Sequence, residues 1–347
     1  MSIKAKIALV AVAALCVAVA VAAGAVLALT RDTIDETMSF SEIGNYLNRE
    51  SSWYGTDEAV TVANAIVKYQ LADGGWRKEW ANPEVTGSWA KSTIDNDGTT
   101  SEIYILAKVY NETHKRKYKT ACLKGIDLLI DAQYDNGGWA QVFDDAGTYH
   151  AHITYNDHAM EHVMTLLMQV ADMSGDFSFV GKSRAEKAKT AVDKGIKCIL
   201  DTQIIAGGKK TAWCQQHDEF TLAPAAGRAY EHPSICTAES VGIVQFLMSL
   251  PEPSDEVLKS IDAAVAWMQE AQLDGIKYVT QGDDKVVIED PDAEPLWARF
   301  YEIGTNRPIF GDRDGSLHYD VSEISQERRT GYAWYGTWCK KLVANAG

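Results

Sequence analysis

The sequence predicts an all-α fold, an α/α toroid built from repeated helical pairs with long loops and minor short strands. The first observation behind this prediction is a pattern that occurs four times: an apolar helical stretch ends in a glutamine and is soon followed by glycine. The four glutamines, Gln70, Gln133, Gln203 and Gln272, lie 63, 70 and 69 residues apart, and a period of this kind indicates a repeat architecture. The second observation is a further helical stretch between successive copies, so each repeat is a helical pair.

The first helix of each repeat is predicted from the spacing of its apolar residues. In the second copy Ile126, Leu129 and Ile130 recur at three and four positions, which is the helical period and not the strand period. The glycines end these helices, because glycine takes a left-handed C-terminal position without strain. The four copies span residues 63–76, 125–139, 195–208 and 263–275, and the intervening helices span residues 101–110, 159–173 and 240–250.

In such a toroid the loops that join the helices form the rim of a bowl, and we expect function to lie on those loops. Two of the glycine turns continue into a tryptophan, Trp76 and Trp139. Each ring either packs over the end of its helix or stacks on a sugar ring. The sequence leaves both interpretations open.

Residues 1–30 are predicted to be a signal peptide or a signal anchor. Lys4 and Lys6 precede an uncharged run from residue 7 to residue 29, which has the polarity of an export signal and is long enough to span a bilayer. We therefore expect the protein to be secreted or held at the cell surface, in contact with a membrane only through that anchor. Residues 31–347 contain no linker-like tract and are enough for one large domain or two closely packed ones. We expect one domain, in a monomer.

The composition excludes some classes of partner. The chain has 33 basic and 48 acidic residues, a net charge of −15, so a broad basic surface for nucleic acid is not expected. An acidic protein that binds an anionic polymer needs a bound cation or a few clustered arginines. Cysteines show no C-x-x-C spacing, which argues against a zinc site, and we expect no catalytic cysteine.

A polar loop at residues 91–100 precedes the second predicted helix. It contains Asp95, Asn96 and Asp97. One such residue suffices to cap a helix, but two carboxylates and an amide together also form the oxygen-rich, flexible ligand set that calcium prefers.

A second loop of this kind, residues 150–158, ends in Asn156 and Asp157. Both residues again allow capping. The two loops follow the first two glycine turns at matching places, so we expect them to face the same bowl, which favours calcium. Histidines in the loop raise the alternative of a transition metal, but their neighbours are hard oxygen donors; these histidines are His150, His152 and His158.

Arginines stand out in two later segments of this acidic chain. By residue type alone, Arg228 is best explained by a surface ion pair with Glu231. Arg299, Arg307 and Arg313 lie among aromatic residues. Their concentration indicates carboxylate recognition.

Taken in order, the motifs from about residue 59 to residue 338 resemble those of the family 10 polysaccharide lyases, which are pectate lyases. The segments that carry the resemblance are Gly-Gly-Trp76 with Lys78, Ser92-Thr-Ile-Asp95-Asn96, Gly-Gly-Trp139, Ile153-Thr-Tyr-Asn156-Asp157, Thr211-Ala-Trp-Cys-Gln-Gln-His217, Arg228 with Tyr230-Glu231, Trp297-Ala-Arg299-Phe-Tyr301, Arg307-Pro-Ile-Phe and Glu327-Arg-Arg with Gly331-Tyr-Ala-Trp334. One departure is Asp97-Gly98, which stands where the family usually has Gly-Ala.

The resemblance implies a calcium-dependent pectate lyase that cleaves polygalacturonate by β-elimination, with residues 31–347 as its catalytic domain. It implies that Arg228 is the base and that Asp95 takes part in catalysis. Calcium is expected at Asp95, Asn96 and Asp157. Substrate is expected to be held by Arg299, Arg313, Lys91 and Tyr230.

Arginine is an unusual base because its pKa in proteins exceeds about 12. A base role therefore needs positive charge nearby, which calcium, Arg299 and Arg313 would supply. Two alternatives stay open: a toroid glycoside hydrolase with Asp95 or Asp97 and Asp157 as its acid and base, and a non-catalytic pectin-binding surface protein.

Overall fold

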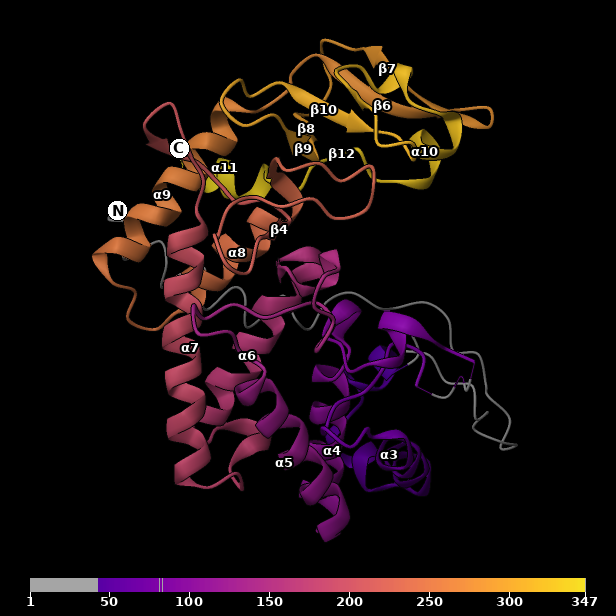
Figure 1. Cartoon of the computed structure of the whole chain (residues 1–347), viewed down its shortest axis with the longest axis vertical. Helices are drawn as coiled ribbons and strands as arrows, with labels where there is room; N and C mark the ends of the chain where they lie inside the picture. The colour runs from indigo at the N-terminus through magenta and orange to yellow at the C-terminus, as the bar shows by residue number, and fades with distance from the viewer. Residues whose placement is uncertain (1–42, 81, 83, 347) are drawn as a thin grey trace.

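The computed structural model of the protein describes residues 43–80, 82 and 84–346. The predicted export segment, residues 1–30, lies outside them. Among the described helices, none has both the length and the apolar character needed to cross a membrane. Figure 1 shows a helical part at the bottom and a part rich in strands at the top.

The helical part is built from antiparallel pairs in which α4 packs on α5, α6 on α7, and α8 on α9. α4, α6 and α8 are buried over much of their length, whereas α5, α7 and α9 bury one face. The helices are α3 (Asp57–Tyr69), α4 (Thr100–Thr113), α5 (Arg116–Asp131), α6 (Ala159–Ala171), α7 (Lys182–Thr202), α8 (Thr237–Ser249), α9 (Asp255–Glu270), α10 (Gln326–Gly331) and α11 (Lys340–Ala346). Short 3-10 turns are η1 (Gly44–Tyr46), η2 (Ser51–Gly55), η3 (Gly87–Ala90), η4 (Asp95–Asp97), η5 (Tyr149–Ala151), η6 (Asn156–His158), η7 (Gly175–Phe177) and η8 (Val321–Glu323).

The repeated glutamines join one helical repeat to the next. The side-chain amide of Gln133 donates to the carbonyl of Gly137 in its own turn at 2.9 Å and to that of Ala191 on α7 at 2.8 Å. Gln70 and Gln203 make the equivalent pairs of hydrogen bonds. The period in the sequence therefore corresponds to a glutamine side chain that is hydrogen-bonded to the next repeat.

The tryptophans after the glycine turns belong to the core. Trp76 and Trp139 are fully buried, and their indole nitrogens donate to the carbonyls of Ile66 and Leu129 in the preceding helices. Of the two interpretations that the sequence left open, packing over the helix end is correct. Neither ring can stack on a sugar.

Seven of the twelve strands in the described part of the chain lie after α9, and the strand pairs are antiparallel. β5 (Ile235–Cys236), β9 (Phe300–Tyr301), β10 (Pro308–Gly311) and β11 (Leu317–His318) form a four-stranded sheet in the order β11-β10-β9-β5. The paired strands elsewhere are β1 (Ile153–Thr154) with β4 (Gln216–His217), β2 (Ile205–Ala206) with β3 (Lys209–Lys210), β6 (Ile276–Gln281) with β7 (Asp284–Glu289), and β8 (Trp297–Ala298) with β12 (Tyr335–Gly336). A second core cluster, which includes Phe300, Phe310 and Trp334, packs beside the larger sheet.

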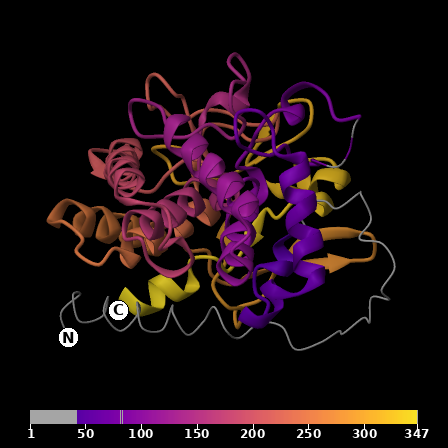
Figure 2. The same cartoon turned by 90° about the horizontal axis from the view of Figure 1, so that it is seen from below.

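The prediction of an all-α fold, and with it of an α/α toroid, is wrong. Three helical pairs form, but the fourth copy of the repeat does not lead into another pair. After α9 the chain enters the β6–β7 hairpin, where β-branched residues flank a turn at Gly282, whose φ is +66°, as a hairpin turn requires. Both views place this hairpin on the side of the molecule opposite α9 (Figure 1 and Figure 2).

Candidate active site

Two loops that lead into buried helices share one backbone conformation. η4 precedes α4 and η6 precedes α6. The second and third residues of each turn are left-handed, with φ between 47° and 64°. Asn, Asp and His occupy these positions, and Asn and Asp in particular tolerate this region. Non-glycine residues held in it cluster at functional sites.

The acidic and amide side chains of these loops do not cap the helices. The N-cap residues are Thr99 for α4 and His158 for α6, and neither side chain accepts a hydrogen bond from its helix. The helices therefore do not use the side-chain oxygens of Asp95, Asn96 or Asp157. This removes the capping explanation for the residue types found there.

In the first loop the carboxylate of Asp95 is surrounded by donors. Asn96 Nδ2 donates to Asp95 Oδ2 at 2.9 Å, and Gln141 Nε2 donates to Asp95 Oδ1 at 2.7 Å. The ammonium of Lys78 also contacts Asp95 Oδ2. Asp95 itself is only 2% exposed.

The second loop repeats this arrangement with the carboxylate and the amide exchanged. Asn156 Nδ2 donates to Asp157 Oδ2 at 2.7 Å, and Gln215 Nε2 donates to Asn156 Oδ1 at 2.7 Å. The Oε1 atoms of Gln215 and of its counterpart Gln141 are buried and, among the described residues, have no hydrogen-bond partner. The two loops thus bring several oxygen acceptors into one region.

Negative charge at this place is incompletely balanced. The pKa of Asp157 is raised by burial and by the nearby carboxylates of Glu239 and Asp95, and Arg299 opposes this only in part. Within the described part of the chain, Asp157 forms no ion pair. A bound cation would relieve this repulsion.

The donor set fits a hard divalent cation. Carboxylates from Asp95 and Asp157 and the amide of Asn96 offer oxygen ligands from two neighbouring loops, which is the chemistry that calcium prefers. The buried amide oxygens of Gln141 and Gln215, which have no partner among the described residues, are further oxygen acceptors beside these ligands. These residues could hold such a cation.

A separate group of metal-type ligands lies elsewhere. The ligand atoms of His152, Asp218 and Glu219 lie within 4.8 Å of one another. A 2.8 Å contact between His152 Nδ1 and Glu219 Oε2 accounts for much of this proximity. The transition-metal ligands considered from the sequence, His150, His152 and His158, do not form a common group in the described structure.

The departure from the family pattern at Asp97 is paired locally. The carboxylate of Asp97 contacts His162 on α6. Next to it His158 Nδ1 lies 3.7 Å from the buried Glu161, and Glu161 raises the pKa of His158. Gly242 makes room for this histidine, because an added Cβ would lie 2.0 Å from His158 Nδ1.

Arg228 is held by Glu231 in a forked ion pair. Arg228 Nε donates to Glu231 Oε2 at 3.0 Å, its Nη2 donates to Oε1, and its backbone N–H donates to Oε2 at 2.8 Å. Burial alone would lower the pKa of Arg228, but the carboxylate of Glu231 outweighs it and raises the pKa above its ordinary value. In this state Arg228 is a guanidinium cation with a side chain 45% exposed.

A chain of hydrogen bonds connects this arginine to the second loop. Gln215 Nε2, which donates to Asn156, also lies within 3.1 Å of Glu231 Oε1. The hydroxyl of Tyr332 donates to the same oxygen at 2.8 Å. The ion pair that holds Arg228 is therefore built into the walls of the site.

Arg299 lies between β8 and β9 and is more deeply placed, with a side chain 13% exposed. Its Nη2 donates to Glu239 Oε1 at 2.8 Å, while its Nε is buried and finds no acceptor within the described residues. The ring of Tyr332 lies 5.2 Å from the Arg299 guanidinium and 5.6 Å from that of Arg228. One aromatic ring thus lies within cation–π distance of both cations.

Three other predicted substrate contacts lie in different settings. Lys91 donates to Asp145 at 2.9 Å, and the exposed Arg313 forms a bidentate pair with Glu327 at 2.8 Å. Tyr230 is 5% exposed. Its ring lies 4.9 Å from the Arg228 guanidinium, so it supports that arginine from the interior.

The sequence contained a signal for three site residues that were not predicted, Lys78, Gln141 and Gln215, and for Arg299, which was predicted. Four side chains that reach into the site region stand two residues after a buried tryptophan: Lys78 after Trp76, Gln141 after Trp139, Gln215 after Trp213 and Arg299 after Trp297. Extending the tryptophan repeat by two positions would have found all four. Tyr332 carried no comparable signal.

Comparison with families of known proteins finds a match that covers most of the chain. The profile of the pectic acid lyase family matches residues 64–343. A search of curated proteins finds no match.

Two solved structures of a family 10 polysaccharide lyase from Cellvibrio cellulosa are similar to this chain. One is 33% identical, with a TM-score of 0.76 over 91% of this chain and 97% of the other. The second is a mutant of that lyase in complex with trigalacturonic acid; it is 32% identical, with a TM-score of 0.75 over 89% of this chain and 98% of that one.

Proposed function

The chain belongs to the pectic acid lyase family, the family 10 polysaccharide lyases, and from this premise we propose how its residues cleave polygalacturonate. It is a pectate lyase. Family membership sets aside the glycoside hydrolase and the non-catalytic binding protein. The observation that carries the residue assignments is the hydrogen-bonded link from the Asn156–Asp157 loop to Arg228 through Gln215 and Glu231, with the Asp95–Asn96 loop next to it.

The reaction is a β-elimination. The hydrogen on C5 of a galacturonate unit leaves as a proton, and a double bond forms between C4 and C5. The glycosidic oxygen departs from C4 with the bonding electron pair and takes a proton from solvent. Proton loss builds negative charge beside a carboxylate that is already an anion. Positive groups placed at that carboxylate therefore lower the barrier.

We assign calcium to Asp95, Asn96 and Asp157. When bound, calcium would neutralise the substrate carboxylate and so acidify the neighbouring C5 hydrogen. Asp95 takes part in catalysis by holding this arrangement together with its donors Gln141 and Lys78.

Arg299 is assigned to a galacturonate carboxylate. Its buried Nε has a proton that nothing in the described structure accepts, and a carboxylate beside it would complete the guanidinium fork. Lys91 and Arg313 are assigned to units farther along the polymer, and Tyr230 to the support of Arg228.

Arg228 is assigned to removal of the C5 proton. Because Glu231 raises its pKa above the ordinary arginine value, the neutral guanidine is scarce at neutral pH, and its fraction grows only as the solution becomes more alkaline. Proton transfer from C5 then regenerates the guanidinium, which returns its proton to solvent.

Export through residues 1–30, location outside the cytoplasm and a monomeric state belong to the same proposal.

The test uses the exported domain on polygalacturonate, with the ultraviolet absorbance of unsaturated ends as the readout. We expect turnover with calcium, none after exhaustive chelation, and recovery when calcium is returned. Full activity after chelation would remove the calcium assignment. Saturated products would show hydrolysis and would remove the elimination mechanism.

A further inference from the structure

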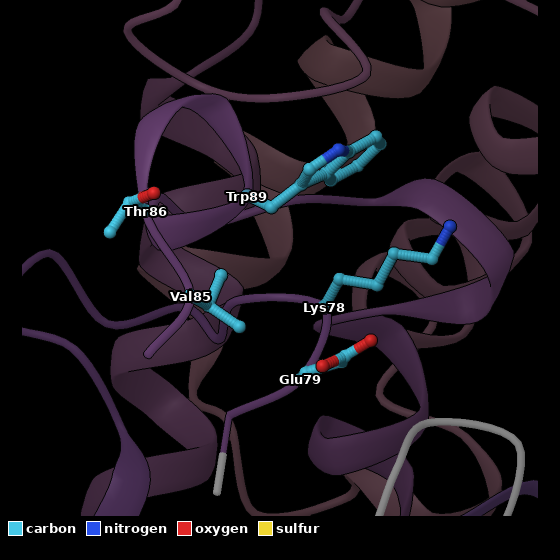
Figure 3. Close-up of a pocket in the computed structure, with 5 residues that line it drawn as sticks. All are labelled: Lys78, Glu79, Val85, Thr86 and Trp89. Atoms are coloured by element: carbon cyan, nitrogen blue, oxygen red, sulfur yellow. The ribbon is translucent and has the colours of Figure 1, made fainter. Parts of the chain in front are cut away.

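A pocket beside the candidate active site has the features of a sugar-binding subsite. Its volume is about 370 Å³, and Lys78, Glu79, Val85, Thr86 and Trp89 line it. Figure 3 shows the side chains of Lys78 and Trp89 extending in the same direction. The volume falls within the range of roughly 300–1,000 Å³ that is usual for small-molecule sites.

The chemistry of the lining suits one unit of an acidic polysaccharide. The Trp89 indole is partly exposed and offers an aromatic face to the C–H face of a pyranose ring. The ammonium of Lys78 lies 4.7 Å from the Trp89 ring centre, where it can attract a carboxylate on the same sugar. Glu79 supplies an acceptor for hydroxyl groups. This combination differs from the purely apolar lining expected for a lipid.

The pocket is continuous with the site already described. Lys78 contacts Asp95 in the first loop. On the other side, Trp89 packs edge-on against His150 at 4.8 Å, and His150 lies 4.0 Å from the ring of Tyr149. Tyr149 is close enough to both Asp95 and Arg228 to interact electrostatically with them. A polymer lying across the site thus has a path to the pocket.

We propose that this pocket binds a galacturonate unit of the polymer at a distance from the cleaved bond, with Trp89 stacking on the sugar and Lys78 attracting its carboxylate. This inference rests on the proposed function, because it assigns a further part of the same substrate. Trp89 is then a specificity residue: it increases the rate on long chains and leaves the chemical step unchanged.

Chain-length dependence tests the proposal. kcat/KM is measured on purified oligogalacturonates of increasing length for the wild type, Trp89→Ala and Trp89→Phe. We expect the wild-type kcat/KM to rise with chain length. For Trp89→Ala, kcat/KM should not increase at the length that first fills the pocket, so it should be about 3- to 10-fold below the wild type on long chains only. Trp89→Phe should recover part of it. Equal losses at every length, or no loss at any length, would overturn the proposal.

Thr86 provides a second test that does not depend on the tryptophan. Its side chain is exposed, so Thr86→Asp and Thr86→Lys should fold. The aspartate should reduce the long-chain gain and the lysine should increase it, and added salt should weaken both effects. Identical behaviour of the two variants would contradict carboxylate binding.

Phe220→Ala is the matched control, because this ring is 85% exposed and does not line the pocket. We expect its chain-length profile to match the wild type; a loss equal to that of Trp89→Ala would show that the effect is not specific to the pocket. Failure of the proposed function is read separately, as absence of wild-type turnover at every length. In that event, calorimetric titration of long oligogalacturonate into wild type and Trp89→Ala decides the pocket on its own, and equal affinities would overturn it.

Discussion

At the scale of single residues, Arg228 shows why residue type did not settle function. Its sequence allowed an ion pair with Glu231 or a role in catalysis, and the structure contains the ion pair. The same pair is also tied to the Asn156 loop through Gln215. A local interaction and a place in the site therefore coexist, and the pair sets the protonation state of the arginine.

Replacing Arg228 and its partner distinguishes a base from a fixed cation. Arg228→Lys keeps the charge but loses the planar fork, so we expect near-normal binding of oligogalacturonate and a fall in kcat of at least about 100-fold, the usual range for a lost general base. Glu231→Gln removes the anion that raises the pKa of Arg228. If Arg228 is the base, the alkaline rise of the pH–rate profile should move to lower pH in this variant.

Two outcomes would contradict this assignment. Turnover of Arg228→Lys within a few-fold of wild type would place the base elsewhere. An unshifted pH profile in Glu231→Gln would leave Arg228 as a charge that stabilises the transition state. Tyr332→Phe is the control, since it removes a hydrogen bond to the same Glu231 oxygen without changing any charge.

Substitution of Arg299 and of Arg313 should distinguish a buried contact with a substrate carboxylate from an exposed one. Arg299 is nearly buried, and its Nε has no partner among the described residues, so Arg299→Ala should lower kcat/KM strongly and weaken binding. Arg313 is exposed and already paired with Glu327, so Arg313→Ala should raise KM by only a few-fold. Equal effects of both variants on kcat/KM and KM would contradict this expectation, because they would show that burial of the arginine does not determine its contribution to substrate binding.

At the scale of elements, the sequence showed the glutamine repeat but did not show that its last copy is followed by strands instead of a further helical pair. Four glutamines marked helix ends, and three of them form bridges between repeats. The fourth, Gln272, bonds only to the nearby Asp274 in the described structure, and the chain beyond it forms strands. Period alone could not reveal this change, because the signal for it lay in the β-branched residues 286–288.

The positions of site residues were predictable in part for the same reason. Both Asp/Asn loops could be located from their places in the repeat, since equivalent turns precede α4 and α6. Their failure to cap the helices depends on consecutive left-handed residues, which composition does not specify. Tyr332 joins the site only through long-range folding, more than 100 residues after Arg228 in the sequence.

The glutamine bridges should contribute to stability where they are buried. Gln203→Ala leaves the carbonyls of Thr211 and Ser260 without their donor in a buried place, so we expect a loss of about 1–3 kcal/mol in the free energy of unfolding. Gln272→Ala, at the equivalent place without a bridge, should change it by less than about 0.5 kcal/mol. Urea unfolding measures both, and equal losses would show that the bridge is not the cause.

Glu102 in the first turn of α4 should make stability depend on pH in an unusual direction. Burial raises its pKa from 4.5 to about 8, and Trp80 donates to one of its oxygens. The folded state therefore keeps a proton that the unfolded state loses, so stability falls as pH rises from about 4.5 to about 8. Glu102→Gln mimics the neutral acid and should gain up to a few kcal/mol over the wild type across this window.

Urea unfolding at several pH values between 4.5 and 8 measures this difference. The exposed Glu112 lies on the same helix, and Glu112→Gln should follow the wild type at every pH. Parallel curves for Glu102→Gln and the wild type would contradict the buried proton.

At the scale of the whole molecule, the enzyme and its substrate are both anionic. A net charge of −15 repels polygalacturonate at long range, so attraction must come from local groups. We propose that Arg299, Lys78 and a cation bound at the two loops recognise the carboxylates of the polymer. Methyl esterification of pectin removes those carboxylate charges while leaving the sugar rings in place.

Highly methyl-esterified pectin should therefore be a poorer substrate than polygalacturonate at the same concentration of sugar units. We expect kcat/KM to fall progressively as the degree of esterification rises, because each ester removes a contact to an arginine or to the cation and leaves those charges unpaired. The measurement is the initial rate of formation of unsaturated ends on pectins of graded esterification, with enzymatically de-esterified samples of the same pectins as controls. Equal rates across the series would mean that the cationic groups do not select the substrate, and the carboxylate assignments of Arg299 and the calcium loops would then fail together.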